Sequence, residues 1–186
     1  MPTEITTEFL HRIREAISQG HDTEIKSAFN EWYPADIAQI IQELNDAEAL
    51  TVFKSIPPDM ASEVILELDE ARREILLSSL STKQIAAQID NMNSDDAADV
   101  IAELPEKIQS EVLSQIEDVS QASDIAELIN YTEGTAGSLM AKELVRVYTN
   151  NHVSDCIHQI REQAENVDIM YAVYVVDEVG RLRGML

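Results

Sequence analysis

Residues 33–44 read YPADIAQIIQEL, and residues 93–104 read NSDDAADVIAEL, with large apolar residues at matching places. Between residues 33 and 128 the chain divides into eight such units of twelve residues. The ninth and twelfth positions are large and apolar in every unit, as Ile41, Phe53, Ile65, Leu77, Ile89, Ile101, Leu113, Ile125, and Leu44, Ile56, Leu68, Leu80, Met92, Leu104, Ile116, Leu128. With 45% hydrophobic residues, this agreement has a chance probability on the order of 10⁻⁶. The stretch therefore predicts one structural unit repeated along the chain.

Each unit has the pattern of a short amphipathic helix. Its apolar residues fall mainly at positions 5, 8, 9 and 12, which is the i, i+3, i+4, i+7 spacing of one helical face. The units begin with residues that cap helices or fit a first turn, namely Asn45, Asp69, Ser81, Asn93, Pro34, Pro57, Pro58 and Pro105. A helix of about nine residues is not stable alone in water. We therefore predict a mainly α fold, an α-solenoid in which short helices bury their apolar faces against one another.

The flanking segments differ from the repeat. Two predicted helices over 7–19 and 22–33 precede it, and we expect them to cap the solenoid. After Tyr131 comes a Gly-containing connector, and then a strand–helix–strand–turn–strand order typical of a truncated α/β unit. The predicted division is a helical domain over 1–131, a connector over 132–142 and a partial α/β domain over 143–186.

Charge and composition exclude several classes of protein. The chain of 186 residues has 35 acidic and 13 basic residues, a formal net charge of −22. This charge argues against nucleic-acid binding and against docking on an anionic membrane, and it suits carboxylates that meet cations. The single cysteine, Cys156, allows no internal disulfide. The N-terminus lacks the apolar segment of a secretory signal, and no apolar run is long enough to cross a bilayer, so we expect no membrane insertion by this chain.

Four segments together resemble the cytosolic part of MgtE-type magnesium transporters. They are YPADIAQIIQEL, NSDDAADVIAELP (93–105), TAGSLM (135–140) and YVVDEVGRLRGML (174–186), although Tyr33 and Ser138 depart from the His and Gly usual at those places. In that family a right-handed superhelical N domain is followed by tandem CBS domains, a connecting helix and a membrane pore. The resemblance implies that this chain holds the N domain and the start of the first CBS domain. The rest of the CBS pair, the connecting helix and the pore are then expected beyond Leu186.

The resemblance also implies Mg²⁺ ligands on Glu63, Asp95 and Asp99. Asp95 and Asp99 are four residues apart, so both carboxylates project from one helix face. Mg²⁺ prefers oxygen ligands and retains several waters, so a few carboxylates suffice. The backbone carbonyls near Gly137 and Ser138 are further candidates. The competing interpretation is that these acids are ordinary residues at helix starts, where the helix dipole favours negative charge, and that the connector is only a flexible hinge.

The expected function is therefore the Mg²⁺-sensing and gating region of a magnesium transporter, on the cytoplasmic side of the cell membrane and in a homodimeric protein. Bound Mg²⁺ would hold the closed form by screening repulsion between acidic surfaces. The alternative is an α-solenoid interaction scaffold, because the helical part also resembles the flagellar rotor switch protein, which lacks a CBS segment. Nucleotide binding by a CBS pair needs both halves of the pair. We expect no enzyme, because no nucleophile elbow or phosphate-binding Gly loop surrounds the Ser, His and Asp residues.

Overall fold

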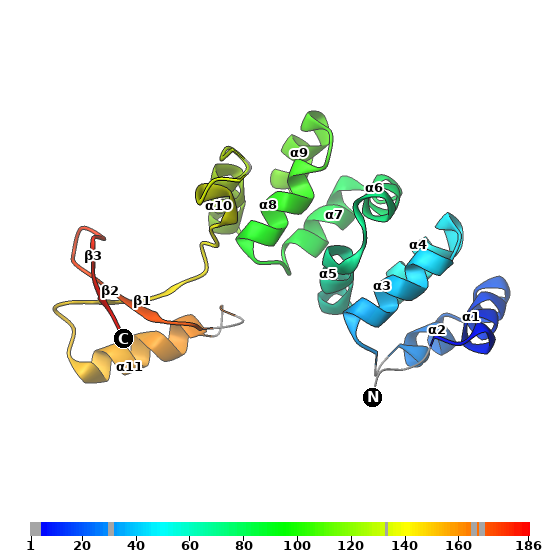
Figure 1. Ribbon diagram of the computed structural model, residues 1–186, viewed down its shortest axis with the longest axis horizontal. Coiled ribbons are helices and arrows are strands. Elements are labelled where there is room, and N and C mark those ends of the chain that lie inside the picture. Colours follow the sequence, from blue (N-terminus) through cyan, green and yellow to red (C-terminus); the bar gives the residue numbers. More distant parts are fainter. Residues whose placement is uncertain (1–4, 30–31, 133, 165–166, 168–169) are drawn as a thin grey trace.

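A row of short helices leads into a small sheet in the computed structural model (Figure 1), which describes residues 5–29, 32–132, 134–164, 167 and 170–186. We call the helices over 7–128 the helical stack and the strands and helix over 145–185 the α/β unit. The stack comprises α1 (Thr7–Gln19), α2 (Asp22–Ala28), α3 (Pro34–Glu43), α4 (Asp46–Ser55), α5 (Pro58–Glu67), α6 (Glu70–Ser78), α7 (Thr82–Ile89), α8 (Ser94–Ala102), α9 (Glu106–Leu113) and α10 (Val119–Leu128). The predicted fold class is confirmed.

The twelve-residue period sets the spacing of the helices. From α3 to α9 each helix begins twelve residues after the one before, and α10 begins one residue late. Helices two units apart pack together, α3 on α5, α5 on α7 and α7 on α9, with α4 on α6 and α8 on α10. Figure 1 shows the result as an arc that runs from the blue α1 to the olive α10.

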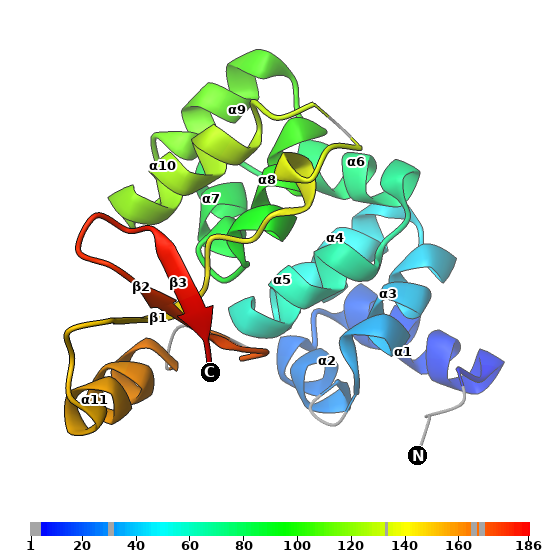
Figure 2. The same ribbon diagram turned by 60° about the vertical axis from the view of Figure 1, so that its left-hand side comes forward.

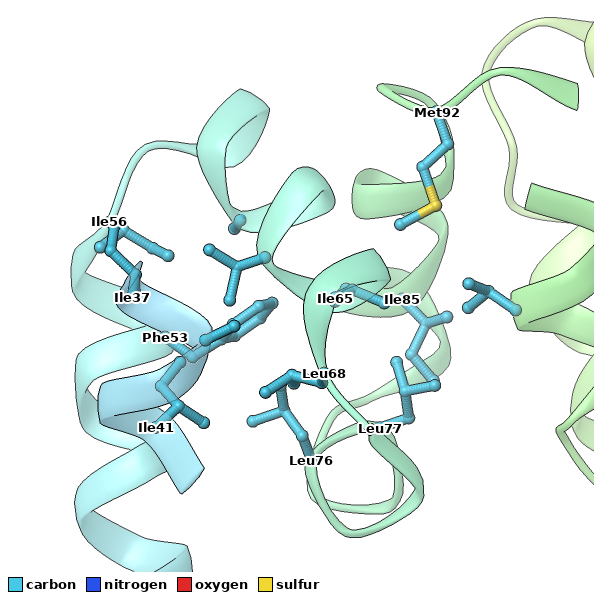
Figure 3. Packing of buried hydrophobic residues seen from close by; sticks show 14 of the residues in the cluster. Ile37, Ile41, Phe53, Ile56, Ile65, Leu68, Leu76, Leu77, Ile85 and Met92 are labelled. Carbon is cyan, nitrogen blue, oxygen red and sulfur yellow. The ribbon is translucent and has the colours of Figure 1, made fainter. Parts of the chain in front are cut away.

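The core consists of the side chains that the repeat predicts. Thirteen of the sixteen residues at the ninth and twelfth positions are buried, and Leu80, Leu104 and Leu113 are half-buried against the same cluster. Phe53, Ile65 and Leu77 come from three successive units, and Figure 3 shows their side chains gathered in one apolar interior. The predicted register is therefore confirmed.

Most helix starts are capped as the sequence predicts. Asn45 and Glu48 form a reciprocal capping box at α4, and Ser81 and Gln84 form another at α7. Asp69 Oδ1 accepts a hydrogen bond from the Arg72 N–H at the start of α6. At α8 the predicted cap differs, because the Asn93 side chain makes no capping hydrogen bond there.

Two long-range contacts tie units three apart. Arg72 donates from Nη2 to the carbonyls of Ile41 (2.8 Å) and Leu44, at the end of α3. Gln121 Nε2 donates to the Met92 carbonyl at 3.0 Å, beyond the end of α7. Both side chains donate to carbonyls at or just beyond a helix end, where the regular intrahelical hydrogen bonds run out, so they tie each helix end to a later unit.

At the N-terminal end, α1 and α2 pack against α4 as the predicted cap. The Phe9 ring stacks on Trp32 with centroids 4.6 Å apart, which closes the apolar interior at this end. The helix expected over 22–33 is shorter, because α2 ends at Ala28 and its expected continuation includes residues 30 and 31, which lie outside the described residues.

The α/β unit has three short strands and one helix. β1 (Val145–Tyr148) runs parallel to β2 (Val173–Val176), and β3 (Leu182–Met185) pairs antiparallel with β2. Helix α11 (Val153–Gln163) packs on β1, where Cys156 and Ile160 contact a small apolar cluster built on Val145, Val147 and Val173. All of β3 is exposed. Cys156 is half-buried on the side of α11 that faces this cluster.

Candidate cation-binding groove

Helix α8 carries two of the three predicted ligands. Ala97, Ala98, Val100 and Ile101 are buried in the stack, so the remaining face of α8 points outward. Asp95 and Asp99 lie on that face, Asp95 half-buried and Asp99 exposed. The four-residue spacing thus places both carboxylates along one side of the helix, as the sequence predicts.

Both carboxylates line a groove of about 910 Å³, which we call the acidic groove. Its charged lining residues among those described are Glu70, Arg73, Asp95, Asp96, Asp99 and Glu103. The opposite wall is the connector, which contributes Gly134, Ser138 and Leu139, with Tyr131 just before it. Figure 2 shows the yellow connector running in front of α8. Because five carboxylates and one guanidinium line the acidic groove, its surface carries a strong net negative charge.

Burial and neighbouring charges both act on the pKa of Glu103 in the acidic groove. Its carboxylate forms an ion pair with Arg73, Oε2 to Nε, at 3.0 Å. Partial burial raises the pKa of Glu103, the Arg73 guanidinium lowers it, and the negative charges of Glu70 and Asp99 raise it, with a net upward shift. Burial is the largest of these causes, so the raised pKa of Glu103 reflects mainly the loss of water around its carboxylate.

Gly137 lets the connector pack closely against the ring of Tyr131. A Cβ atom at Gly137 would overlap the ring of Tyr131, so only glycine fits at this point of the short helical turn η1 (Gly137–Leu139). Tyr131 is held in turn by the hydrogen bond from its hydroxyl to Glu127 Oε1 (3.1 Å). Ser138, next to Gly137, is a lining residue of the acidic groove. The family resemblance names the backbone carbonyls near Gly137 and Ser138 as candidate ligands.

The structure separates Glu63 from the other two predicted ligands. Glu63 is exposed on α5 and is not a lining residue of the acidic groove. Within the described residues, no three His, Cys, Asp or Glu side chains lie in an arrangement that could by itself hold a metal ion. A cation at Asp95 and Asp99 would therefore need further oxygen ligands from water or from another part of the protein.

Sequence reasoning missed one acid of the groove that it could have found. Glu103 follows Asp99 by four residues and Asp95 by eight, so it continues the same helix face. Glu70 and Arg73 come from α6, two units earlier, and their arrival depends on how the units stack, which the spacing within α8 does not reveal.

Comparison with known proteins shows which family the chain belongs to. The sequence profile of the MgtE intracellular N domain matches residues 32–134, more than half of the chain. The chain belongs to the MgtE N-domain family. The match begins just before the first twelve-residue unit and ends inside the connector, so it includes the whole repeat and all of α8.

Relatives of the MgtE N-domain chain are magnesium transporters. It is 26% identical over 176 residues to the magnesium transporter MgtE of Thermus thermophilus, covering 94% of this chain and 39% of that protein. It is 24% identical over 179 residues to the magnesium transporter MgtE of Bacillus subtilis, covering 96% of this chain and 40% of that one. The chain therefore spans about two fifths of the length of these relatives.

Solved structures share the MgtE fold along nearly the whole chain. The cytosolic domain of the Mg²⁺ channel MgtE in complex with ATP superposes with a TM-score of 0.83 at 26% identity, covering 95% of this chain and 72% of that one. The soluble part of a magnesium transporter gives a TM-score of 0.77 at 22% identity, covering 95% and 70%. The resemblance stated from the sequence is thus confirmed. Among the described residues, none of the helices combines the length and apolarity needed to cross a membrane.

Proposed function

We propose that this chain is the Mg²⁺-sensing and gating region of an MgtE-type magnesium transporter, on the cytoplasmic side of the membrane. The observation that carries the proposal is the acidic groove, in which Asp95 and Asp99 face the connector across a surface with five carboxylates and one guanidinium. Divalent cations favour such oxygen-rich surfaces, and Mg²⁺ keeps its waters where the protein supplies few ligands.

The same groove suggests how the ion acts. The chain has a net charge of −22, so repulsion between its carboxylates opposes any arrangement that brings acidic surfaces together. Mg²⁺ bound between Asp95, Asp99 and oxygen atoms of neighbouring parts favours the compact form by its differential affinity, and its loss favours the open form. We propose that those neighbouring parts are the rest of the CBS pair and the connecting helix, and that the compact form keeps the pore of the homodimer shut. Glu63 would serve a separate contact from the exposed face of α5.

The first test compares two charge-matched variants of this chain. Asp95→Asn/Asp99→Asn removes two charges from the acidic groove, and Glu106→Gln/Glu111→Gln removes two from exposed positions of α9, one of them also in a first turn. Binding to the folded form stabilises it by about 2.7 kcal/mol at a hundredfold excess of ion over Kd. At constant ionic strength, the Mg²⁺-dependent rise in Tm should shrink in the first variant and persist in the second. An equal response in both would place Mg²⁺ elsewhere and leave Asp95 and Asp99 as helix-start acids.

A further inference from the structure

A guanidinium from α6 lies in the acidic groove together with the expected cation ligands. The Arg73 side chain is only 17% exposed, and it lines the groove with Asp95, Asp99 and Glu103. Its Nε atom pairs with Glu103 Oε2 at 3.0 Å. Its Nη1 atom donates to the Ile65 carbonyl at 3.5 Å, which is long for a hydrogen bond. The ion pair with Glu103 is therefore the stronger of these two contacts.

Glu103 lies close to the carboxylates that we expect to bind the cation. It directly follows the last residue of α8 and comes four residues after Asp99, so about one helical turn separates the two side chains. Burial is the main cause of the raised pKa of Glu103, but the negative charges of Glu70 and Asp99 also raise it. Asp99 therefore lies within electrostatic range of the Arg73–Glu103 pair.

The pair is partly shielded from water. The side chains of Arg73 and Glu103 are 17% and 27% exposed, so their charges are screened less than those of a surface pair. A fixed positive charge in the groove repels a second cation, and the carboxylate that it holds is not free to turn toward that cation. Both effects oppose Mg²⁺ binding at Asp95 and Asp99.

We propose that Arg73 is a resident counter-ion of the acidic groove, which neutralises part of its negative charge when no metal is bound and thereby lowers its affinity for Mg²⁺. This inference rests on the proposed function, because it concerns the same site. It assigns an affinity-setting role to a residue that is not itself a ligand. The Mg²⁺ concentration at which the groove fills then depends on Arg73 as well as on the carboxylates.

Isothermal titration calorimetry with Mg²⁺, at constant ionic strength, tests the charge balance in this chain. Arg73→Gln should lower Kd about fivefold, the order of magnitude of one charge–charge interaction at short range in a water-accessible site. Glu103→Gln removes a carboxylate and leaves the guanidinium unpaired, so it should raise Kd by a similar factor. The double variant Arg73→Gln/Glu103→Gln keeps the net charge of the parent, and its Kd should return close to the parent value.

Two control variants isolate the charge of Arg73. Arg73→Lys keeps the positive charge in the groove and should leave Kd near that of the parent. Lys107→Gln removes one positive charge from an exposed position of α9, and its Kd should stay within about twofold of the parent because a distant exposed charge is screened. The gain in Arg73→Gln should also shrink near 1 M salt, where the Debye length falls to about 3 Å.

A purely structural role for Arg73 predicts the opposite result. If the residue only tied α6 to α8, Arg73→Gln would distort the groove and raise Kd. An Arg73→Gln Kd at or above the parent value would overturn the proposal, and so would a Glu103→Gln Kd at or below it. The second variant keeps Arg73 in place, so it tests the same claim even where Arg73→Gln folds poorly.

Thermal melts without Mg²⁺ provide an independent measurement. Arg73→Gln should have a lower Tm than the parent in the absence of the ion, and it should gain more from added Mg²⁺, because the metal replaces the missing counter-ion. The Asp95→Asn/Asp99→Asn variant distinguishes the two proposals. If it binds Mg²⁺ as tightly as the parent, the proposed function fails and this inference fails with it. If its binding is weakened while Arg73→Gln does not bind more tightly, only the role of Arg73 is wrong.

Discussion

At the scale of single residues, burial separates the positions that stabilise the stack from those that contribute little to its stability. Ile65 and Ile101 sit at ninth positions and are 0% exposed, whereas Val119 at the start of α10 is 81% exposed. Replacing either isoleucine by Ala should lower the free energy of unfolding by about 2–5 kcal/mol, because it removes buried methylenes and leaves a cavity. Val119→Ala should stay within about 0.5 kcal/mol. Urea titrations measure all three, and equal small losses would contradict the twelve-residue register.

A second residue-scale prediction concerns pH. Burial raises the pKa of Glu103 above its ordinary value of 4.5, so the folded chain holds this proton more readily than the unfolded chain. The stability from Glu103 is therefore present below the unfolded pKa and is lost as pH rises through the folded pKa. In urea unfolding from about pH 4 to about pH 7, Glu103→Gln should decline less with pH than the parent. Parallel curves, as expected for a Glu106→Gln control, would show that Glu103 does not titrate in this way.

At the scale of elements, the α/β unit should be the less stable part. Its strands have four residues each, β3 is wholly exposed, and only a small cluster around Val145, Val147 and Val173 holds β1 and β2 to α11. Backbone amides open more readily where few apolar contacts cover them. Hydrogen exchange in dilute solution should thus be faster in β1 and β2 than in α5, where Val64 and Ile65 are 0% exposed. Uniform protection in a proven monomer would contradict this expectation.

The elements also show what a sequence can predict here. The repeat predicted the helix starts and the core because one unit contains its own signals, such as Asn45 with Glu48 or Ser81 with Gln84. The contacts of Arg72 with α3, and of Glu143 with Ser94, join residues 28 to 49 positions apart. Such contacts depend on how units stack and where the connector docks. The sequence also does not decide whether Asp95 and Asp99 bind a cation, because a helix dipole and a bound cation both favour acidic residues at the start of a helix.

At the scale of the whole molecule, the apolar clusters predict where the chain can be cut. Every buried residue of the large cluster lies between Ile13 and Leu128, whereas the small cluster draws only on residues 145–175. Among the described residues, polar contacts join the two parts across the connector, chiefly Ser94 with Glu143 and Glu127 with Lys142. A fragment of residues 1–131 therefore keeps every buried residue of the large cluster, and it loses the contacts that Lys142 and Glu143 make with α10 and with the start of α8.

We accordingly expect the fragment 1–131 to fold alone, with cooperative unfolding and a Tm within about 8 °C of the parent, the shift that loss of one helix cap produces in a domain of this size. A fragment of residues 143–186 should not fold alone, since chains this short rarely bury enough apolar surface without disulfides, metals or a partner. Circular dichroism melts of the two fragments and the parent test both statements. A 1–131 fragment without a cooperative transition would mean that the connector and sheet complete the helical core, against the separation of the two clusters.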